Sequence, residues 1–282
     1  MRVNTTSDPR TFASRAGDWL AREPVANNVL LVHALDPAGI PPGDGEPVFA
    51  WIEDPAGSVL GAGFTRAPYR MTISAMPVAA SRALAERLAE LQTALPGVNG
   101  PTDAATQFAA RWSELAGTPA HREREQWIMQ CLETVRPADP PGRPRLATHD
   151  DLDMVAEWFS ASMRDSGMTR QDVLRRSRHL VGGQLAGKRL IVWEAEDGTP
   201  VGAAGWAPPI AGVVRPSGVF VVPERRDGGY ATLLLGEVTA RALESGVDAC
   251  VCTHYLKYQS MQAVVENVGY RRLLDLVEYR FD

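Results

Sequence analysis

The sequence contains few cysteines and no long hydrophobic run, and these two absences exclude several classes of protein. Its 3 cysteines, Cys131, Cys250 and Cys252, are too few and too far apart for a disulfide framework or a four-ligand zinc site, so we expect no metal. Cys250 and Cys252 would share one face of a strand, a pattern typical of buried structural cysteines. No segment approaches the roughly 20 apolar residues that span a bilayer, so we expect no insertion into a membrane.

An excess of basic residues is also missing. The formal net charge is −5 at pH 7 and the basic residues are scattered, so we expect no nucleic-acid partner. The first residues, MRVNTTSDPRTF, lack the long apolar core of a secretory signal, which indicates a cytoplasmic protein. The expected partner is therefore a small molecule, and the sequence leaves a homodimer open.

The length of 282 residues favours two domains. The segment RPADPPGRPR, residues 136–145, carries four prolines and a glycine, which interrupt both helices and strands. We interpret residues 136–144 as a linker that joins a first domain, residues 1–135, to a second, residues 145–282.

The second half of the chain alternates between strand and helix patterns. A short strand is expected at 145–147, followed by helices that cover 152–159 and 171–181. The stretch LIVWEAEDGTPVGAAGWA predicts a hairpin that turns at Asp197-Gly198, the dipeptide most typical of a two-residue hairpin loop. The remaining elements are expected as a strand at 218–222, a helix at 230–245, a strand at 249–253, a helix at 259–267 and strands at 271–274 and 277–281.

The first half has nearly the same order of elements, which predicts a duplicated α/β unit. An unrelated α/β domain that uses the same order is the alternative. The expected elements are helices at 10–21 and 26–35, a hairpin formed by PVFAWIE and SVLGAGFT, a strand at 70–76, helices at 79–95 and 102–115, and closing strands within 123–135.

The segment GVFVVPERRDGGYATLLL contains the candidate ligand-binding residues. In it an apolar strand ends at Pro223, and Gly228-Gly229 open a helix. The first N–H groups of a helix have no internal partner and lie at the positive end of its dipole, so they attract an anion such as phosphate. Arg225 or Arg226 would add a charge-assisted contact. The alternative is a tight connection that needs glycine only for its backbone angles.

Arg226, Gly229 and Ala231 follow this strand in the order of the coenzyme A signature Gln/Arg-x-x-Gly-x-Gly/Ala, and the sequence resembles the GNAT superfamily of N-acyltransferases. Val268-Gly269-Tyr270 matches the Ile/Leu-Gly-Phe/Tyr step of that superfamily. The resemblance covers residues 145–282. It implies an α/β (α+β) protein of two GNAT-like domains, each a mixed, largely antiparallel central sheet flanked by helices.

The first domain resembles a degenerate copy, because its corresponding junction, MPVAASRAL, has no glycine between Met76 and Leu84. In tandem proteins of this kind the silent half shapes the acceptor pocket and braces the working half. The resemblance therefore assigns the cofactor to the second domain.

The resemblance implies that acetyl-CoA, or another short acyl-CoA, binds along the strand with its pyrophosphate on the amides that open the helix. An amide of the strand would polarise the acyl carbonyl, and a primary amine would attack it directly in a ternary complex. The residues implied in cofactor binding are Phe220, Val221, Val222, Arg226, Asp227, Gly228, Gly229, Tyr230 and Ala231.

One departure concerns proton transfer. The family carries Asn-Pro-x-Ser and, four residues later, a Tyr that protonates the leaving thiolate, whereas the matching positions hold Tyr258, Gln259, Met261 and Val265. Either another group or water serves, or the chain is a catalytically impaired acyl-CoA-binding or regulatory protein. A nucleotide-binding domain is a third reading, disfavoured because Gly-x-Gly-x-x-Gly and a Walker lysine are missing.

Three residues near the expected strand end are the candidate catalytic groups. Tyr258 and Tyr255 are the nearest substitutes for the missing tyrosine. Histidine side chains titrate near neutral pH, so His254 could accept a proton from an ammonium substrate. Structural tyrosines and a solvated loop histidine are the alternatives, and the C-terminal carboxylate of Asp282 is a further conceivable base.

Overall fold

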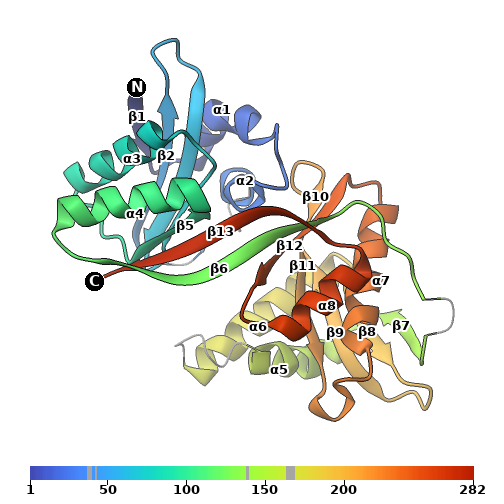
Figure 1. The fold of residues 1–282 in the computed structure, drawn as a ribbon. Coiled ribbons are helices and arrows are strands. Elements are labelled where there is room, and N and C mark those ends of the chain that lie inside the picture. The colour runs from blue at the N-terminus through green and yellow to red at the C-terminus, as the bar shows by residue number, and fades with distance from the viewer. Residues whose placement is uncertain (37–39, 42, 138–139, 163–168) are drawn as a thin grey trace. The chain divides into compact units, whose positions relative to one another are not determined.

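The computed structural model describes residues 1–36, 40–41, 43–137, 140–162 and 169–282, and these form two compact units (Figure 1). Unit 1 contains Met1–Met129, Thr253–Tyr258 and Arg272–Asp282, and unit 2 contains Gln130–Cys252 and Gln259–Arg271. The boundaries expected at residues 135 and 145 follow the order of the chain. The contacts instead assign the end of the chain to unit 1. No helix in the described ranges is long and apolar enough to cross a membrane.

Unit 1 contains a mixed sheet whose strands follow the order β1-β2-β3-β4-β5-β13-β6, in which β13 (Arg271–Phe281) is the last strand of the chain. From β1 to β13 the neighbouring strands are antiparallel, except β4 and β5, which pair in parallel. The elements of the first half are β1 (Arg2–Thr6), α1 (Pro9–Leu20), α2 (Asn28–Leu35), β2 (Asp44–Glu53), β3 (Val59–Ala67), β4 (Met71–Ile73), α3 (Val78–Glu90), β5 (Gly97–Pro101), α4 (Thr102–Ala116) and β6 (Ala120–Cys131).

Helices cover both faces of this sheet. Leu84 of α3 and Phe108 of α4 share one core with Ile52 of β2 and Val277 of β13. On the other face, Phe12 of α1 contacts Phe49, and their ring centroids lie 5.0 Å apart. Burial on both faces explains why the run VFAWI within strand β2 is continuously apolar instead of alternating.

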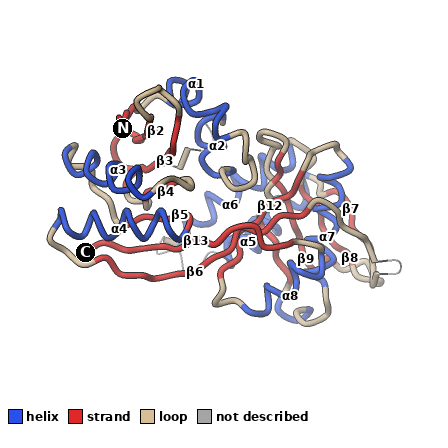
Figure 2. The backbone as a smooth tube through the Cα atoms, turned by 45° about the horizontal axis from the view of Figure 1, so that its top comes forward, coloured by secondary structure: helices blue, strands red, loops and turns tan. Residues whose placement is uncertain are grey.

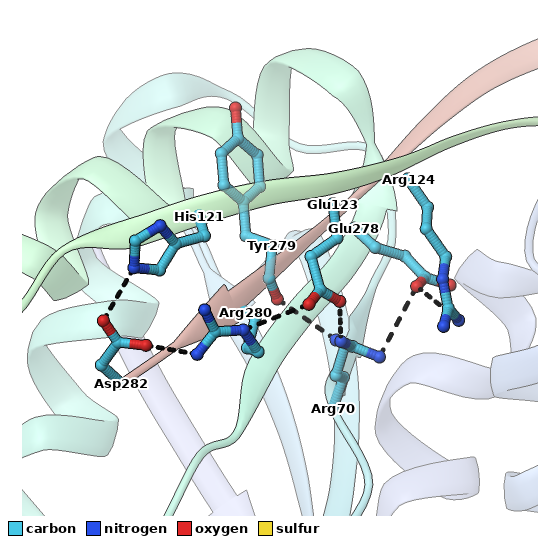
Figure 3. A network of polar contacts seen from close by, with 8 residues as sticks. All are labelled: Arg70, His121, Glu123, Arg124, Glu278, Tyr279, Arg280 and Asp282. Carbon is cyan, nitrogen blue, oxygen red and sulfur yellow. Dashed lines mark hydrogen bonds and ion pairs between the residues drawn. The ribbon is translucent and has the colours of Figure 1, made fainter. Parts of the chain in front are cut away.

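The last strand, β13 (Arg271–Phe281), pairs antiparallel with β5 and runs beside β6 (Figure 2). Ion pairs hold it there: Arg70 pairs with Glu123 and with Glu278, and Arg280 bridges Glu123 and Asp282 (Figure 3). The prediction of two closing strands at 271–274 and 277–281 is wrong. Residues 271–281 form one strand, because the residues between the two expected segments continue the extended backbone.

Two strands of unit 1, β1 and β5, are not predicted by the sequence patterns. β1 is exposed to half-buried and carries the polar sequence RVNTT, and β5 has the sequence GVNGP, in which glycine and proline disfavour a strand. The helix expected at 79–95 ends at Glu90, because Gln92 takes a left-handed conformation with φ of 52°. Instead of the closing strands expected within 123–135, the structure has a single strand, β6, which ends at Cys131.

Unit 2 contains a four-stranded antiparallel sheet in the order β11-β9-β8-β7. A short strand of the same unit, β10, pairs in parallel with β12 instead. The elements of the second half are β7 (Arg143–Leu146), the 3₁₀ helix His149–Asp151, α5 (Leu152–Ser162), α6 (Arg170–Ala186), β8 (Leu190–Glu194), β9 (Pro200–Trp206), β10 (Val213–Val214), β11 (Pro216–Val221), the 3₁₀ helix Pro223–Arg225, α7 (Tyr230–Glu244), β12 (Ala249–Tyr255) and α8 (Gln259–Val268).

Alternate residues of the central strands of unit 2 enter different cores. Val192 of β8 packs with Val155 of α5 and Val181 of α6, whereas Ile191 packs with Leu234 of α7. Helices therefore cover both faces of this sheet, as in unit 1. The predicted hairpin is confirmed, since β8 and β9 are antiparallel and Gly198 takes φ of 81° in the turn between them.

The segment expected as a linker is bonded to unit 2 on both sides of residues 138–139, which lie outside the described residues. Arg136 Nε lies 2.6 Å from Glu237 Oε2 of α7, and Trp193 Nε1 donates to the Pro141 carbonyl at 2.9 Å. Arg145 Nε lies 2.6 Å from Glu194 Oε1, beyond the end of the segment. The prolines interrupt regular structure as expected, but hydrogen bonds and ion pairs hold the described part of the segment in place.

Candidate functional site

A cleft of about 450 Å³ opens in unit 2 between the end of β11, the start of α7 and the start of α8. The end of β11 forms one wall, the turn before α7 and the first turn of α7 form the floor, and the start of α8 forms the opposite wall. The lining residues are Ser162, Val219, Phe220, Val221, Arg225, Arg226, Asp227, Gly229, Tyr230, Ala231, Thr232, Ser260, Met261 and Val264.

A bulge shapes the β11 wall. The register between β11 and β9 shifts between Ser217 and Phe220, and Gly218 takes φ of 70°. A Cβ atom on Gly218 would lie 2.3 Å from the Phe159 ring, so only glycine fits at this position. The bulge interrupts the ladder next to Val219, which lines the cleft. A glycine inside an apolar strand is the sequence signal for such a bulge, and the expected strand at 218–222 did not use it.

The start of α7 provides an electropositive floor. Its N-cap, Gly229, is left-handed with φ of 77°, no side chain caps the helix, and its first turn contains no acidic residue. The positive end of the helix dipole is therefore uncompensated by side chains. A Cβ on Gly229 would meet no atom within 4 Å, so the space beside this residue is open. The glycine therefore allows the left-handed backbone conformation and also leaves the amides of the helix start accessible to a ligand.

Gly228, in the same turn, lies in a more crowded position than Gly229. A Cβ at this position would lie 3.2 Å from the Arg225 carbonyl oxygen and 3.2 Å from the Tyr230 ring. Gly228 does not line the cleft, and neither does Val222, whose amide donates to the Val201 carbonyl at 3.0 Å. The other predicted cofactor residues line the cleft together.

Arg226 is the cation best placed to bind an anion on this floor. Its Nε donates to the Val221 carbonyl at 3.4 Å, and its guanidinium carbon lies 6.0 Å from the centroid of the Phe220 ring. Phe220 in turn stacks on Trp158 with a centroid distance of 5.7 Å. No carboxylate among the described residues pairs with Arg226, so its charge is available to a ligand.

The α8 wall is largely apolar. Met261 and Val264 face the cleft, whereas Val265 is 4% exposed and lies on the buried side of the helix with Val268. The position that faces a ligand is therefore Val264, one residue before the position obtained by counting along the sequence. Ser260 supplies the hydroxyl that α8 brings to the cleft.

The three predicted catalytic residues belong to unit 1, whereas every described residue that lines the cleft belongs to unit 2. His254 is 3% exposed, and its ring lies 5.8 Å from that of Trp127. Burial and the nearby Glu278 raise the pKa of Tyr255, so its hydroxyl stays protonated at neutral pH. Tyr258 is 49% exposed.

The remaining candidate base is the C-terminal carboxylate of Asp282, a residue of unit 1. The side-chain Oδ2 of Asp282 lies 2.7 Å from His121 Nε2, and this side-chain carboxylate pairs with Arg280. These two contacts lower the pKa of the Asp282 side chain, which makes that carboxylate a weaker base. The structure thus gives this side chain a role in holding β13.

The cysteines have the structural role that the sequence predicts. All three are unpaired, and Cys131 and Cys250 are buried. Burial raises the pKa of the Cys250 and Cys252 thiols to about 12, so neither forms a thiolate at neutral pH.

Comparison with solved structures identifies the fold. A GNAT-family acetyltransferase from Colwellia psychrerythraea is similar at a TM-score of 0.66 and 12% identity, over 100% of both chains. A GCN5-related N-acetyltransferase from Sphaerobacter thermophilus gives 0.63 and 16%, over 99% of this chain and 95% of the other. A tandem GNAT protein from the clavulanic acid biosynthesis pathway gives 0.55 and 13%, over 99% and 98%. The chain has a tandem GNAT fold.

The tandem GNAT fold confirms the fold class expected from the sequence. No family model matches the sequence, and no curated protein matches it. At identities of 12 to 16% the likeness shows the fold, and within that fold the glycine turn and the cleft occur in unit 2. The equivalent junction of unit 1, between β4 and α3, has Pro77 as its N-cap and no glycine.

Proposed function

We propose that the chain is an N-acetyltransferase that transfers an acetyl or another short acyl group from coenzyme A to a primary amine, and that it works in the cytoplasm. The observation that carries this proposal is the uncapped start of α7 at Gly229, beside Arg226, on the floor of a cleft at the end of β11. Such a helix start binds phosphate through its free amides and its dipole. The GNAT fold supports acyl transfer as the chemistry.

The residues present fit an acyl-CoA substrate. The amides that follow Gly229 and the guanidinium of Arg226 would hold the pyrophosphate, and the end of β11 at Phe220 and Val221 would hold the pantetheine arm. When bound, the thioester supplies an activated carbonyl carbon to the amine. The bulge next to Val219 gives the chain a strand amide outside the regular ladder, which suits a donor to the carbonyl oxygen.

In the proposed reaction the amine nitrogen forms a bond to the carbonyl carbon, the carbon–sulfur bond breaks, and the thiolate takes up the proton that the amine loses. The side chains of Met261 and Val264 contribute no proton donor. Ser260 or a water molecule would then protonate the thiolate. Tyr255 and Tyr258 keep their proposed role as substitutes for the tyrosine that protonates the thiolate, and His254 would receive the proton of an ammonium substrate.

A second candidate function is an acyl-CoA-binding or regulatory protein without efficient turnover. The observation that favours it is the valine at position 264, since a tyrosine hydroxyl is missing from the cleft-facing side of α8. This candidate shares the cleft and differs only in the chemical step.

Thermal-shift titrations with acetyl-CoA, coenzyme A, ATP and NAD test the proposal, because a ligand bound only by the folded state raises the melting temperature. We expect both coenzyme A forms to raise it and ATP and NAD to have a smaller effect. A lack of response to both coenzyme A forms would contradict both candidate functions. Thiol release from acetyl-CoA with a panel of amines then separates an enzyme from a binding protein.

A further inference from the structure

A side chain of α6, Gln184, reaches across strand β9 and binds the strand that forms one wall of the cleft in unit 2. Gln184 is 3% exposed, and its Nε2 donates to Ser217 Oγ of β11 at 2.8 Å. Ser217 pairs with Gly205 of β9, and the register of the two strands shifts directly after this pair. Gln184 therefore holds β11 at the residue that precedes the bulge.

Gly205 provides the space through which this side chain passes. A Cβ atom on Gly205 would lie 2.3 Å from Gln184 Nε2 and 2.4 Å from Gln184 Cδ. Because β9 is the neighbour of β11 in the sheet, a side chain at this position would displace the amide from Ser217. The missing side chain of Gly205 and the length of the glutamine together bring the amide to β11.

The bulge itself consists of Gly218 and Val219, which together lie opposite the single residue Ala204. Residues in a bulge leave the regular ladder, so their orientation depends on the contacts that surround them. Phe159 of α5 packs against Gly218, since a Cβ there would lie 2.3 Å from its ring. The hydrogen bond from α6 fixes the residue before the bulge. Both helices on this face of the sheet thus hold the bulged segment.

Packing alone does not explain a glutamine at this position of α6. The buried face of the helix also contains Val173 and Val181. The amide oxygen of Gln184, Oε1, is enclosed and accepts no hydrogen bond from the described residues. A buried polar atom without a partner costs free energy, and an apolar side chain of similar length would avoid that cost. The hydrogen bond to β11 is therefore the interaction that distinguishes glutamine from an apolar residue here.

We infer that Gln184 is a positioning residue for the proposed acyl transfer. It holds Ser217, which fixes the bulge, and the bulge directs the amide of Val219 to the carbonyl oxygen of the acyl group. The inference rests on the proposed function. Neither Gln184 nor Ser217 lines the cleft, so their loss should affect the acyl group and leave the contacts to the coenzyme A part intact.

Calorimetric titrations of coenzyme A and acetyl-CoA test the inference, because only acetyl-CoA carries the carbonyl group. Gln184→Met should weaken acetyl-CoA binding roughly fivefold, the effect of one misplaced hydrogen bond, and should leave coenzyme A binding unchanged. Ser217→Ala should have the same effect, whereas Ser217→Thr, which keeps the hydroxyl, should bind like the wild type. Gln184→Met combined with Ser217→Ala should lose no more than either variant alone.

Ser177→Ala is the matched control. Ser177 lies on the same buried face of α6, and its hydroxyl is also enclosed without a hydrogen-bond partner among the described residues. Ser177→Ala should leave both affinities unchanged. The melting temperatures of Ser177→Ala and Gln184→Met should stay near or above that of the wild type, because each variant removes a buried polar atom without a partner.

Turnover gives a second readout. If the wild type releases thiol from acetyl-CoA, Gln184→Met should lower kcat at least about tenfold and leave the KM for the amine unchanged. The ratio of the two affinities requires no turnover, so it also decides the inference for a binding protein. An unchanged ratio in Gln184→Met or Ser217→Ala, or an equal loss of both affinities, would overturn the inference and leave the proposed function standing. A wild type that binds neither form would overturn the proposed function and the inference with it.

Discussion

The side chain of Arg70 lies directly against Gly97 of β5, and a Cβ atom on Gly97 would be 3.0 Å from Arg70 Nε. The same Cβ would lie 2.0 Å from the carbonyl oxygen of Tyr279 in β13. The missing side chain lets Arg70 reach across β5, where its Nε donates to the Tyr279 carbonyl at 3.3 Å. Gly97 thus lets the last strand of the chain pack beside β5.

Gly97→Ala should therefore destabilise the protein by about 2 kcal/mol, because the added methyl group overlaps the backbone of β13. Urea unfolding measures this loss. Gly182→Ala is the matched control, since a Cβ on this helical glycine meets nothing within 4 Å and should stabilise the chain by up to about 1 kcal/mol. Equal unfolding midpoints for Gly97→Ala and the wild type would show that β13 does not pack as described.

The two valines of α8 should respond in opposite ways to a tyrosine. Val264→Tyr places the ring in the cleft and should leave the unfolding free energy nearly unchanged, whereas Val265→Tyr overpacks a site that is 4% exposed and should cost roughly 1–3 kcal/mol. If thiolate protonation limits turnover, Val264→Tyr should also raise kcat. A more stable Val265→Tyr than Val264→Tyr would reverse the assignment of the cleft-facing side.

Arg226 should contribute strongly to coenzyme A affinity. Arg226→Ala should raise the Kd for coenzyme A roughly tenfold or more, because a charge-assisted contact to the pyrophosphate is lost. Arg226→Lys should have an intermediate effect, since it keeps the charge and loses the contacts to Phe220 and the Val221 carbonyl. The control is Arg178→Ala, which removes an exposed arginine paired with Asp153, and it should leave the Kd unchanged. Calorimetry that finds no difference between Arg226→Ala and the control would remove Arg226 from the site.

Acid should destabilise unit 2 through Asp151. Hydrogen bonds from Arg145, at 2.7 and 2.8 Å, and from the Thr148 amide lower the pKa of this carboxyl. A lowered pKa stabilises the fold above the unfolded-state value and stops doing so as pH falls through the folded-state value, so the loss should appear below about pH 4. Asp151→Asn should be less stable at pH 7 and should lose less stability between pH 4 and pH 2.5. Parallel unfolding curves for the two proteins across this range would contradict the assignment.

The sequence predicts the parts of this protein whose signals are local. The glycine turn, the hairpin at Asp197-Gly198 and the long apolar stripe of α7 depend on neighbouring residues, and each occurs where it is expected. The position of β13 depends on pairing with β5, and β5 is not predicted because its glycines and proline disfavour a strand. No local pattern therefore indicates that the end of the chain joins unit 1.

The same distinction applies to the candidate site. Arg226 and Gly229 follow from a short motif, whereas Ser162, Ser260 and Val264 enter the cleft because separate helices converge on β11. Counting residues along α8 cannot decide which of two adjacent valines faces a ligand, because packing against α7 sets the rotation of that helix. The proton-handling groups depend on such packing and remain predictions.

Calorimetric titration of acetyl-CoA into the wild type, Gly229→Trp and Gly117→Trp tests the central claim most directly. Both glycines are left-handed, with φ of 77° and 68°, and a Cβ on either meets no atom within 4 Å, so the two variants carry the same strain. Gly229 opens α7 on the cleft, whereas Gly117 ends α4 in unit 1. We predict that Gly229→Trp abolishes acetyl-CoA binding and that Gly117→Trp binds like the wild type. Binding of acetyl-CoA by Gly229→Trp at wild-type affinity would contradict the account.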